Sequence, residues 1–328
     1  MHIPLEKVFS INSEEEFNKI ALQVFKYQSG NNPVYNSFLK NLSINIDLIS
    51  NVDEIPYLPI SFFKTHEIIT PNGANYQQVF LSSATTGSVQ SKHFVHNLKL
   101  YEKSYLKGFE TFYGDIDKYC ILALLPSYQE RTGSSLIYMV DDLIKKSNHP
   151  KSGYFLNNLS HLAQTLDELK KDNQPCILIG VTYALLDLIE SQKIDFPNLI
   201  IMETGGMKGR RKEMVREELH GQLRMGFNVS AIHSEYGMTE LLSQAYSLGN
   251  GIFHCTPWMK VSARDVNDPL SRVENGKTGG LNVIDLANLY SCSFIATQDL
   301  GRILRNGDFE VLGRFDNSDI RGCNLLVQ

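Results

Sequence analysis

Short apolar runs alternate with amphipathic patterns through the middle of the chain. The runs predict buried strands at 119–125, 176–179 and 199–202. Apolar residues at helical spacing predict helices between them, at 134–146, 159–169 and 183–190. Continuous apolar strands separated by helices are typical of a parallel sheet that is covered on both faces. The pattern therefore predicts an α/β fold with mostly parallel sheets flanked by helices.

The first part of the chain predicts helices that pack on this core. Ser13 and Glu16 form a capping-box pattern, and apolar residues then follow at helical spacing as far as Gly30. Similar spacing predicts helices over 34–42 and 100–112. Prolines at 56 and 59 predict an extended path between these two helices.

The pattern changes again in the last third of the chain. A helix is predicted over 210–225, and the apolar run 229–232 predicts a strand that leads into the polar segment 233–240. Short strands separated by Gly, Asn and Asp follow at 281–285, 293–296, 309–312 and 320–327. These predict a β-rich subdomain with a small barrel-like sheet. We therefore expect an N-terminal helical segment over 1–75, an α/β core over 76–260 and a β-rich subdomain over 261–328.

Composition limits the possible classes of protein. The 328 residues are 42% apolar and 20% charged, which is normal for a packed globular chain. A net charge of -5 argues against nucleic-acid binding, which needs a basic surface. The five cysteines form no Cys-x-x-Cys pair, which argues against a disulfide framework and a zinc site. With no apolar run long enough for a membrane span and no signal-peptide pattern, we expect a soluble, cytoplasmic protein.

The segment from Leu81 to Lys92 is rich in hydroxyl side chains and follows a short apolar run. Hydroxyl groups and backbone N–H groups donate hydrogen bonds to anions, Gly87 permits close approach, and a lysine adds positive charge. The Walker spacing is absent, which excludes a P-loop NTPase. This segment is interpreted as a phosphate-binding loop, and the alternative is an ordinary hydroxyl-rich surface turn.

Two further polar segments follow predicted strands, at 203–206 and 236–240. Ligands of open parallel sheets bind at the carboxyl ends of the strands, so we expect all three segments to share a site. Glycines at 205 and 206 allow a flat base to lie against the backbone, and Tyr236 offers a ring for stacking. Glu240 can bind Mg²⁺ through oxygen. Asp299 can accept hydrogen bonds from ribose hydroxyls, and Arg314 can bind ribose or phosphate.

The order of these segments resembles the core motifs of the adenylate-forming superfamily. The segments are Ser-Ser-Ala-Thr-Thr-Gly at 82–87, Gly-Gly at 205–206, Tyr-Gly-Met-Thr-Glu at 236–240, Thr-Gln-Asp-Leu-Gly at 297–301 and Gly-Arg-x-Asp at 313–316. The resemblance covers roughly 56–328. It is closest to the branch that contains phenylacetate-CoA ligase and the acyl-protein synthetases, which are long-chain fatty acid:protein ligases. It implies the large-domain fold of that superfamily.

The resemblance also implies roles for individual residues. The ATP β- and γ-phosphates would be bound by Ser83, Thr85, Thr86 and Gly87. Adenine would lie against Gly205 and Gly206, with Tyr236 stacked on it. Thr239 would contact the α-phosphate, Glu240 would bind Mg²⁺, and ribose would be held by Asp299 and Arg314. In the family reaction a carboxylate and ATP give acyl-AMP and pyrophosphate, and the acyl group then passes to a thiol.

The acyl substrate is assigned to the segment after the strand that ends at Leu125. Tyr128, Glu130 and Arg131 lie there, and the last two can pair and orient a carboxylate. The alternative is an ordinary strand-to-helix loop with Thr132 or Ser134 as helix cap. His233 either lines the site or is a structural histidine.

The chain departs from the family pattern at several positions. Ala84 and Gln298 stand where glycine is usual, and Lys92 lies further from Gly87 than the usual phosphate-loop lysine. After Asp316 the chain is expected to lack the mobile C-terminal lid domain and its catalytic lysine. The acyl-protein synthetase branch carries its acyl group on a cysteine near the C-terminus, and Cys323 occupies the matching segment. The alternative for Cys323 is a buried structural thiol.

The predicted function is ATP- and Mg²⁺-dependent activation of a carboxylic acid, in particular a fatty acid, with transfer of the acyl group to a protein thiol. The expected partners are the acid and an acceptor protein thiol or a reductase, with no nucleic acid and no membrane span. Two alternatives stay open. One is a ligase that transfers the acyl group to CoA or a carrier protein, and the other is a non-catalytic adenylate-binding protein.

Overall fold

The computed structural model describes residues 5–71, 73–83, 89–125, 133–156, 158–205, 211 and 214–314. Its contacts divide the chain into two units. The terminal unit comprises Met1–Gln78, Ser91–Leu98 and His254–Gln328, and the central unit comprises Val79–Gln90 and Lys99–Phe253. The expected three-part division at residues 75 and 260 stays a prediction.

The central unit contains a mostly parallel sheet. Its strands are β4 (Cys120–Leu124), β5 (Gly153–Tyr154), β6 (Cys176–Gly180), β7 (Ile200–Glu203), β8 (His233–Tyr236) and β9 (Ala245–Ser247). They lie in the order β5-β4-β6-β7-β8-β9, and only β9 runs antiparallel to its neighbour within this set. The predicted α/β class is confirmed.

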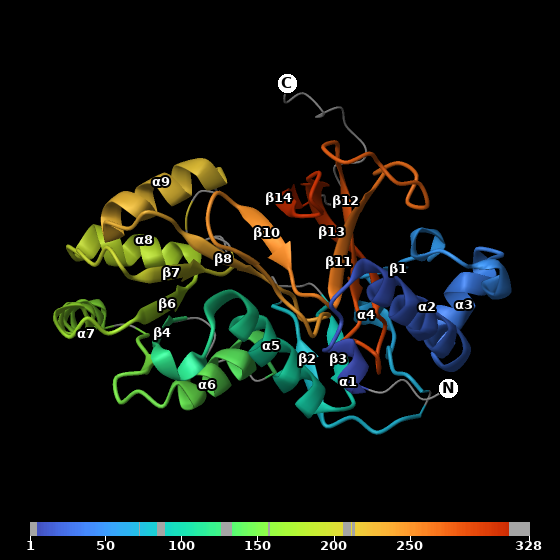
Figure 1. Ribbon diagram of the computed structural model, residues 1–328, viewed down its shortest axis with the longest axis horizontal. Coiled ribbons are helices and arrows are strands. Elements are labelled where there is room, and N and C mark those ends of the chain that lie inside the picture. Colours follow the sequence, from blue (N-terminus) through green and yellow to red (C-terminus); the bar gives the residue numbers. More distant parts are fainter. Residues whose placement is uncertain are drawn as a thin grey trace. The chain divides into compact units, whose positions relative to one another are not determined.

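Helices cover both faces of this sheet. They are α5 (Leu98–Tyr113), α6 (Ser135–Ser147), α7 (Leu159–Lys171), α8 (Thr182–Ser191) and α9 (Arg216–Phe227), with a short 3-10 turn η3 (Ile116–Lys118). In Figure 1, α8 and α9 lie on one face of the strands and α5 and α6 lie on the other. Side chains on opposite faces of β8 therefore meet different helices.

Local sequence explains why these elements begin and end where they do. Strands β4 and β6 are buried along their whole length, as their continuous apolar runs predict. Helix α6 begins after Ser134, whose side chain accepts a hydrogen bond from the Ile137 N–H, and it ends at Asn148 in the left-handed conformation. Ser134 is therefore the helix cap, one of the two residues predicted for that role.

The terminal unit contains an antiparallel meander. Its strands are β11 (Met259–Arg264), β12 (Thr278–Asp285), β13 (Phe294–Ile303) and β14 (Phe309–Arg314), each paired with the next, and the short β1 (Leu58–Pro59) runs parallel to β13. Strand β3 (Lys92–Val95) also belongs to this unit, while β2 (Gln78–Leu81) and β10 (Ile252–Cys255) each have residues in both units. The predicted β-rich C-terminal part is confirmed.

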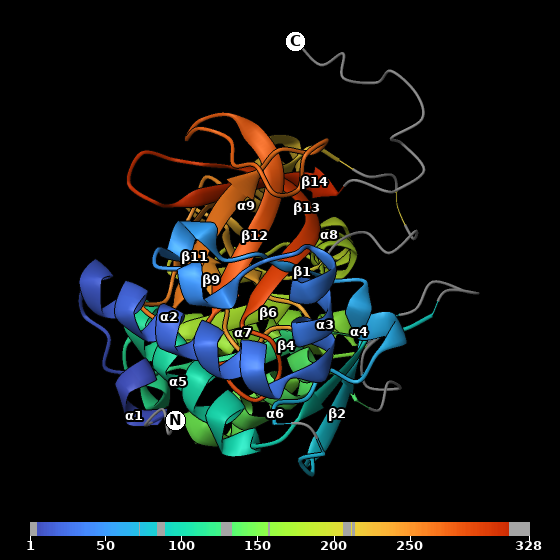
Figure 2. The ribbon, with the colours of Figure 1, turned by 90° about the vertical axis from the view of Figure 1, so that its right-hand side faces the viewer.

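Helices of the N-terminal segment pack on this meander. They are α1 (Leu5–Val8), α2 (Glu14–Asn31), α3 (Pro33–Asn41) and α4 (Phe62–Thr65), with 3-10 turns η1 (Ile46–Leu48) and η2 (Val52–Glu54). Figure 2 shows α2 and α3 beside the meander. The buried Gln28 amide of α2 donates to the carbonyl oxygens of Asn288 and Leu289 at 3.0 and 2.9 Å, and the ring of Phe25 meets Phe294 edge to face. The predicted amphipathic helix is present, with Ser13 as its cap, and it packs on the meander.

Two predicted boundaries are wrong. Helix α9 begins at Arg216 rather than Arg210, because its first turn holds Glu217 and Glu218, and a helix N-terminus favours acidic over basic side chains. Strand β8 covers His233–Tyr236 rather than the apolar run 229–232, so His233 and Tyr236 lie in the strand itself. The polar strand is stable because Ser234 and Glu235 find hydrogen-bond partners on β7 and the residue after it.

Across the described ranges, none of the helices is both long enough and apolar enough to cross a membrane. The four cysteines in those ranges are free thiols.

Candidate functional site

The carboxyl ends of β7 and β8 bring two of the predicted segments together. These strands pair in parallel, with Glu203 opposite Ser234. One residue further along, the Thr204 hydroxyl donates to the Glu235 carboxylate at 3.0 Å. Next along the chain come Gly205, two residues past the end of β7, and Tyr236, the last residue of β8. The turn with Gly205 and the segment that begins with Tyr236 therefore leave the sheet side by side.

Glu203 lies at the centre of a buried polar network below this turn. Its Oε1 accepts from the Thr182 hydroxyl at 2.9 Å, and its Oε2 accepts from the Ser234 hydroxyl at 3.1 Å. His220 Nε2 lies 3.7 Å from Oε2. Burial alone would raise the pKa of this carboxyl group. The contacts with His220 and Thr182 and the positive charge of Arg216 outweigh burial, so the pKa of Glu203 is lowered.

Glu235 and the residue before it lie on opposite faces of β8. The pKa of Glu235 is shifted in the opposite direction to that of Glu203. Burial and the negative charge of Glu203 raise the pKa of Glu235 to about 7, although the hydrogen bond from Thr204 acts in the other direction. The chain then turns at Gly237, where a Cβ atom would lie 2.3 Å from Glu235 Oε1. Any larger residue at Gly237 would require the Glu235 carboxyl group to move.

Tyr236 and His233 are held by packing as well as by the strand. The Tyr236 ring is 8% exposed, and its centroid lies 5.8 Å from that of Phe253. His233 Nδ1 lies 3.2 Å from the Tyr113 hydroxyl, and burial lowers the pKa of His233. A neutral imidazole has one ring nitrogen that donates a hydrogen bond and one that accepts, so it can bind an uncharged group. Both roles stated for His233 stay open.

The hydroxyl-rich loop leaves β2 next to the segment after β4. The Leu81 N–H donates to the Gly133 carbonyl at 2.8 Å, and Ser83 is exposed just beyond. On the other side of the loop, Gln90 Nε2 donates to the Ser82 carbonyl at 2.7 Å. The first bond joins the base of the predicted phosphate loop to the end of the predicted acyl segment, and the second connects the two ends of the loop. The rest of both lies outside the described residues: Thr85, Thr86, Gly87, Tyr128, Glu130 and Arg131.

In the terminal unit, Asp299 and Arg314 contact each other directly. They are register partners on β13 and β14, and Arg314 Nε donates to Asp299 Oδ1 at 3.1 Å. Asp299 is buried and Arg314 is exposed. The pairing gives one acceptor and one donor side by side, which is the arrangement that adjacent ribose hydroxyls require.

Thr239 and Glu240 follow the turn at Gly237. Thr239 is half-buried and Glu240 is 5% exposed. Within the described ranges, no group of three or more His, Cys, Asp or Glu side chains is arranged to hold a metal ion. A single carboxylate suits Mg²⁺ in particular, because this ion keeps several waters and takes further oxygen ligands from substrate phosphates.

Comparison with known proteins decides the family. A sequence model described as "Acyl-protein synthetase, LuxE" matches residues 4–328. The chain belongs to the LuxE family of acyl-protein synthetases. The predicted superfamily branch and the predicted enzyme class are thereby confirmed.

The relatives of this LuxE-family chain agree with that assignment. A long-chain-fatty-acid–luciferin-component ligase of Aliivibrio fischeri is 23% identical over 346 residues, which cover 97% of this chain and 90% of the relative. An open conformation of 2-hydroxyisobutyryl-CoA ligase, with 2-HIB-AMP and CoA, has a TM-score of 0.66 at 11% identity, covering 93% of this chain and 70% of the ligase.

ATP-bound MatB of Rhodopseudomonas palustris has a TM-score of 0.56 at 16% identity and covers 74% of this chain. The chain spans about half the length of MatB, at 49%. At these identities the two solved structures show that the fold is shared, which confirms the predicted adenylate-forming large-domain type.

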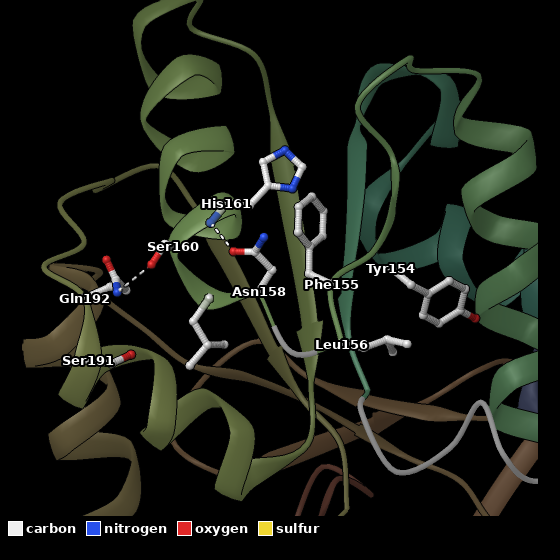
Figure 3. A pocket seen from close by; sticks show the side chains of 9 residues that line it. Tyr154, Phe155, Leu156, Asn158, Ser160, His161, Ser191 and Gln192 are labelled. Carbon is white, nitrogen blue, oxygen red and sulfur yellow. Dashed lines mark hydrogen bonds between the residues drawn. The ribbon is translucent and has the colours of Figure 1, made fainter.

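A hollow in the central unit of this LuxE-family chain lies apart from the predicted residues. It is lined by residues of 154–161 together with Ser191 and Gln192, none of which was predicted to bind a ligand. Figure 3 shows two hydrogen bonds between residues of its lining. Asn158 caps α7 by accepting from the His161 N–H at 2.9 Å, and Gln192 donates to Ser160 at 3.3 Å. We assign no function to this hollow.

Sequence reasoning missed the polar network of Thr182, Glu203 and Glu235. The sequence pattern marks Glu203 only as the start of a segment, and it does not distinguish Thr182 or Glu235 from their neighbours. One signal was available, because each of the three lies at or just after the end of a parallel strand, where ligands bind. Gly206 and Cys323, which were predicted, lie outside the described residues.

Proposed function

We propose that this chain uses ATP and Mg²⁺ to convert a carboxylic acid, in particular a fatty acid, into acyl-AMP, and then transfers the acyl group to a protein thiol. The named relative is a long-chain fatty-acid ligase, which supports a fatty acid as the substrate. The site residues predicted from sequence keep the roles given above.

One geometric observation supports the nucleotide site most strongly. The hydrogen bond between Thr204 and Glu235, at 3.0 Å, holds the Gly205 turn beside the Tyr236 segment. A turn with an exposed glycine next to an aromatic residue can accept a flat base between backbone and ring. Adenine is the base proposed here.

The first step joins the acid to the nucleotide. A carboxylate oxygen attacks the α-phosphorus of ATP, the bond to the β-phosphate breaks, and pyrophosphate leaves. Attack of one anion on another is opposed by charge, so donors near the α-phosphate lower the barrier. Thr239 is proposed to donate there, and Ser83, Thr85 and Thr86 are proposed to hold the two outer phosphates.

Mg²⁺ would be held by Glu240 together with oxygens of the triphosphate. The ion neutralises phosphate charge and orients the leaving pyrophosphate when bound. Glu240 supplies a hard oxygen ligand, and its 5% exposure limits competition from water. Asp299 and Arg314 are proposed to orient the ribose, with Asp299 accepting and Arg314 donating.

The second step moves the acyl group to sulfur. A thiolate attacks the acyl carbonyl carbon, AMP leaves, and a thioester forms. We propose Cys323 as the first acceptor, with a protein thiol or reductase partner receiving the acyl group from it. Cys255 and Cys292 are less suitable, because burial raises the pKa of each thiol to about 12 and keeps it protonated at neutral pH.

Pyrophosphate exchange into ATP tests the first step. With a panel of carboxylic acids, we expect exchange that depends on acid and Mg²⁺ and that CoA leaves unchanged. Glu240→Gln should reduce exchange by about 100-fold or more, since a metal ligand is lost. Glu102→Gln is the matched control, because it removes a carboxylate to which no role in the reaction is assigned, one that accepts from the Tyr138 hydroxyl at 2.7 Å.

Other outcomes favour the alternatives. Formation of acyl-CoA would support transfer to CoA instead of to protein. ATP binding without exchange would support a non-catalytic adenylate-binding protein, and the proposed reaction would then be rejected.

Intact mass spectrometry tests the second step. After incubation with ATP, Mg²⁺ and fatty acid, we expect one acyl adduct on the wild-type chain and on Cys255→Ala, and none on Cys323→Ala. An adduct that persists in Cys323→Ala would exclude Cys323 as the acceptor.

A further inference from the structure

Thr182 bridges the end of β7 and the turn that follows it. It is the first residue of α8 and is only 2% exposed. Its hydroxyl group lies 2.9 Å from Glu203 Oε1 and also makes a short hydrogen bond to the Gly205 carbonyl oxygen. One buried hydroxyl group is thus shared between the last residue of the strand and the glycine of the turn.

The Gly205 turn needs such support. Gly205 has a φ of +73°, in the left-handed region that glycine adopts without steric cost. The same freedom lets a glycine turn move unless other groups hold it. The Gly205 carbonyl is held by Thr182, and the preceding Thr204 side chain is held by Glu235 at 3.0 Å.

Glu203 in turn is fixed from three directions. Ser234 on the neighbouring strand donates to it at 3.1 Å, and His220 of α9 lies 3.7 Å away on the same oxygen. Thr182 occupies the other oxygen. A carboxylate restrained in this way cannot swing, so the position of the Thr182 hydroxyl group is set by the sheet and both helices.

We propose that Thr182 and Glu203 are positioning residues for the nucleotide base. They hold the backbone of the Gly205 turn in the position that adenine binding requires. The inference rests on the proposed function, in which Gly205 lines the adenine. Neither side chain needs to touch the nucleotide. The effect should therefore appear in nucleotide affinity and base preference, while the affinity for the acid stays the same.

Three substitutions separate this role from simple packing. Thr182→Val keeps the shape of the side chain but removes the hydroxyl group that both the Glu203 carboxylate and the Gly205 carbonyl contact. Thr182→Ser keeps the hydroxyl group and loses only a methyl group. Thr165→Val is the matched control, because it removes another buried hydroxyl group, one that donates to the His161 carbonyl within α7 at 2.9 Å.

The measurements are calorimetric Kd for AMP, and KM for ATP and for the acid in pyrophosphate exchange. For Thr182→Val we expect Kd for AMP and KM for ATP to rise about tenfold, the factor that corresponds to one lost hydrogen bond. We also expect a smaller preference for ATP over ITP, and an unchanged KM for the acid. Thr182→Ser and Thr165→Val should stay within about threefold of wild type, since they keep the bonds at the turn.

Unchanged AMP binding and an unchanged ATP-to-ITP ratio in a folded Thr182→Val protein would overturn the inference while leaving the proposed function intact. Wild-type protein that binds no AMP would overturn both. If Thr182→Val does not fold, Glu203→Gln provides the second variant. We expect Glu203→Gln to bind AMP more weakly than wild type. An unchanged AMP affinity would contradict the positioning role.

Discussion

Glu203 and Glu235 lie at the ends of neighbouring parallel strands, yet their carboxyl groups respond to burial in opposite ways. The contacts around Glu203 lower its pKa, whereas the pKa of Glu235 is raised to about 7. The negative charge on Glu203 contributes to the raised pKa of Glu235, because it opposes ionisation of Glu235. At neutral pH this edge of the sheet therefore holds one fixed anion and one group near its titration point.

Stability should depend on pH through Glu235. Its pKa is raised on folding, so its contribution is fully present below the unfolded pKa and is lost as pH rises through about 7. Glu235→Gln cannot ionise and should remove this loss. We expect the free energy of unfolding of the variant, relative to wild type, to increase between pH 5 and 8, the interval set by these pKa values.

Urea unfolding at several pH values measures this difference. Glu203→Gln serves as the opposite case, since the pKa of Glu203 is lowered and the stability that it contributes is lost as pH falls. The pKa shift assigned to Glu235 would be wrong if wild type and Glu235→Gln kept a constant difference across the range.

Two glycines of α9 should respond differently to the same substitution. A Cβ atom at Gly221 would meet nothing within 4 Å, but one at Gly226 would lie 2.6 Å from Ile189 Cβ of α8. Gly221→Ala should raise the free energy of unfolding by about 0.5–1 kcal/mol through reduced backbone entropy of the unfolded chain. Gly226→Ala should lower it by about 1–3 kcal/mol through overpacking.

Thermal or urea unfolding of the two variants gives the comparison directly. Equal effects of the two substitutions would show that α8 and α9 do not pack this closely at Gly226.

Arg264 is expected to be essential to the meander of the terminal unit. Its guanidinium group donates to the Leu281 carbonyl at 2.7 Å, to Asn282 Oδ1 at 2.8 Å and to the Thr297 carbonyl. A lysine cannot reach three acceptors in this arrangement. Arg264→Lys should therefore lower the free energy of unfolding by about 3 kcal/mol.

Arg302→Lys is the control for Arg264→Lys. Arg302 is exposed and pairs with Glu310 at the surface, so its replacement should change the free energy of unfolding by less than about 0.5 kcal/mol. A small effect of Arg264→Lys, comparable to this control, would mean that the three bonds contribute little.

The sequence predicted the fold well where hydrophobic pattern and local capping agree. The continuous apolar runs of β4 and β6 and the caps at Ser13 and Ser134 were read correctly, because burial and backbone hydrogen bonding leave few alternatives there. The order of polar segments predicted the superfamily branch, which the family comparison confirmed.

The errors occurred where polar residues form strands or where contacts are distant in sequence. The polar sequence of β8 predicts a loop. It forms a strand because Ser234 and Glu235 hydrogen-bond to the last residue of β7 and to the residue that follows it, which are distant in sequence. Thr182 and Glu203 are 21 positions apart, and nothing in local pattern indicates that one hydroxyl group joins them. Such networks follow from strand register, which a single sequence does not reveal.

Product analysis in a single turnover tests the central claim most directly. Wild-type protein would be mixed with ATP, Mg²⁺ and a fatty acid, and the nucleotide products separated by chromatography. The proposed reaction predicts acid-dependent pyrophosphate equal to the sum of acyl-AMP and AMP, because transfer to Cys323 releases AMP. In Cys323→Ala, where that transfer is blocked, acyl-AMP and pyrophosphate should be equal. Formation of ADP and phosphate, or of no acid-dependent product, would contradict it.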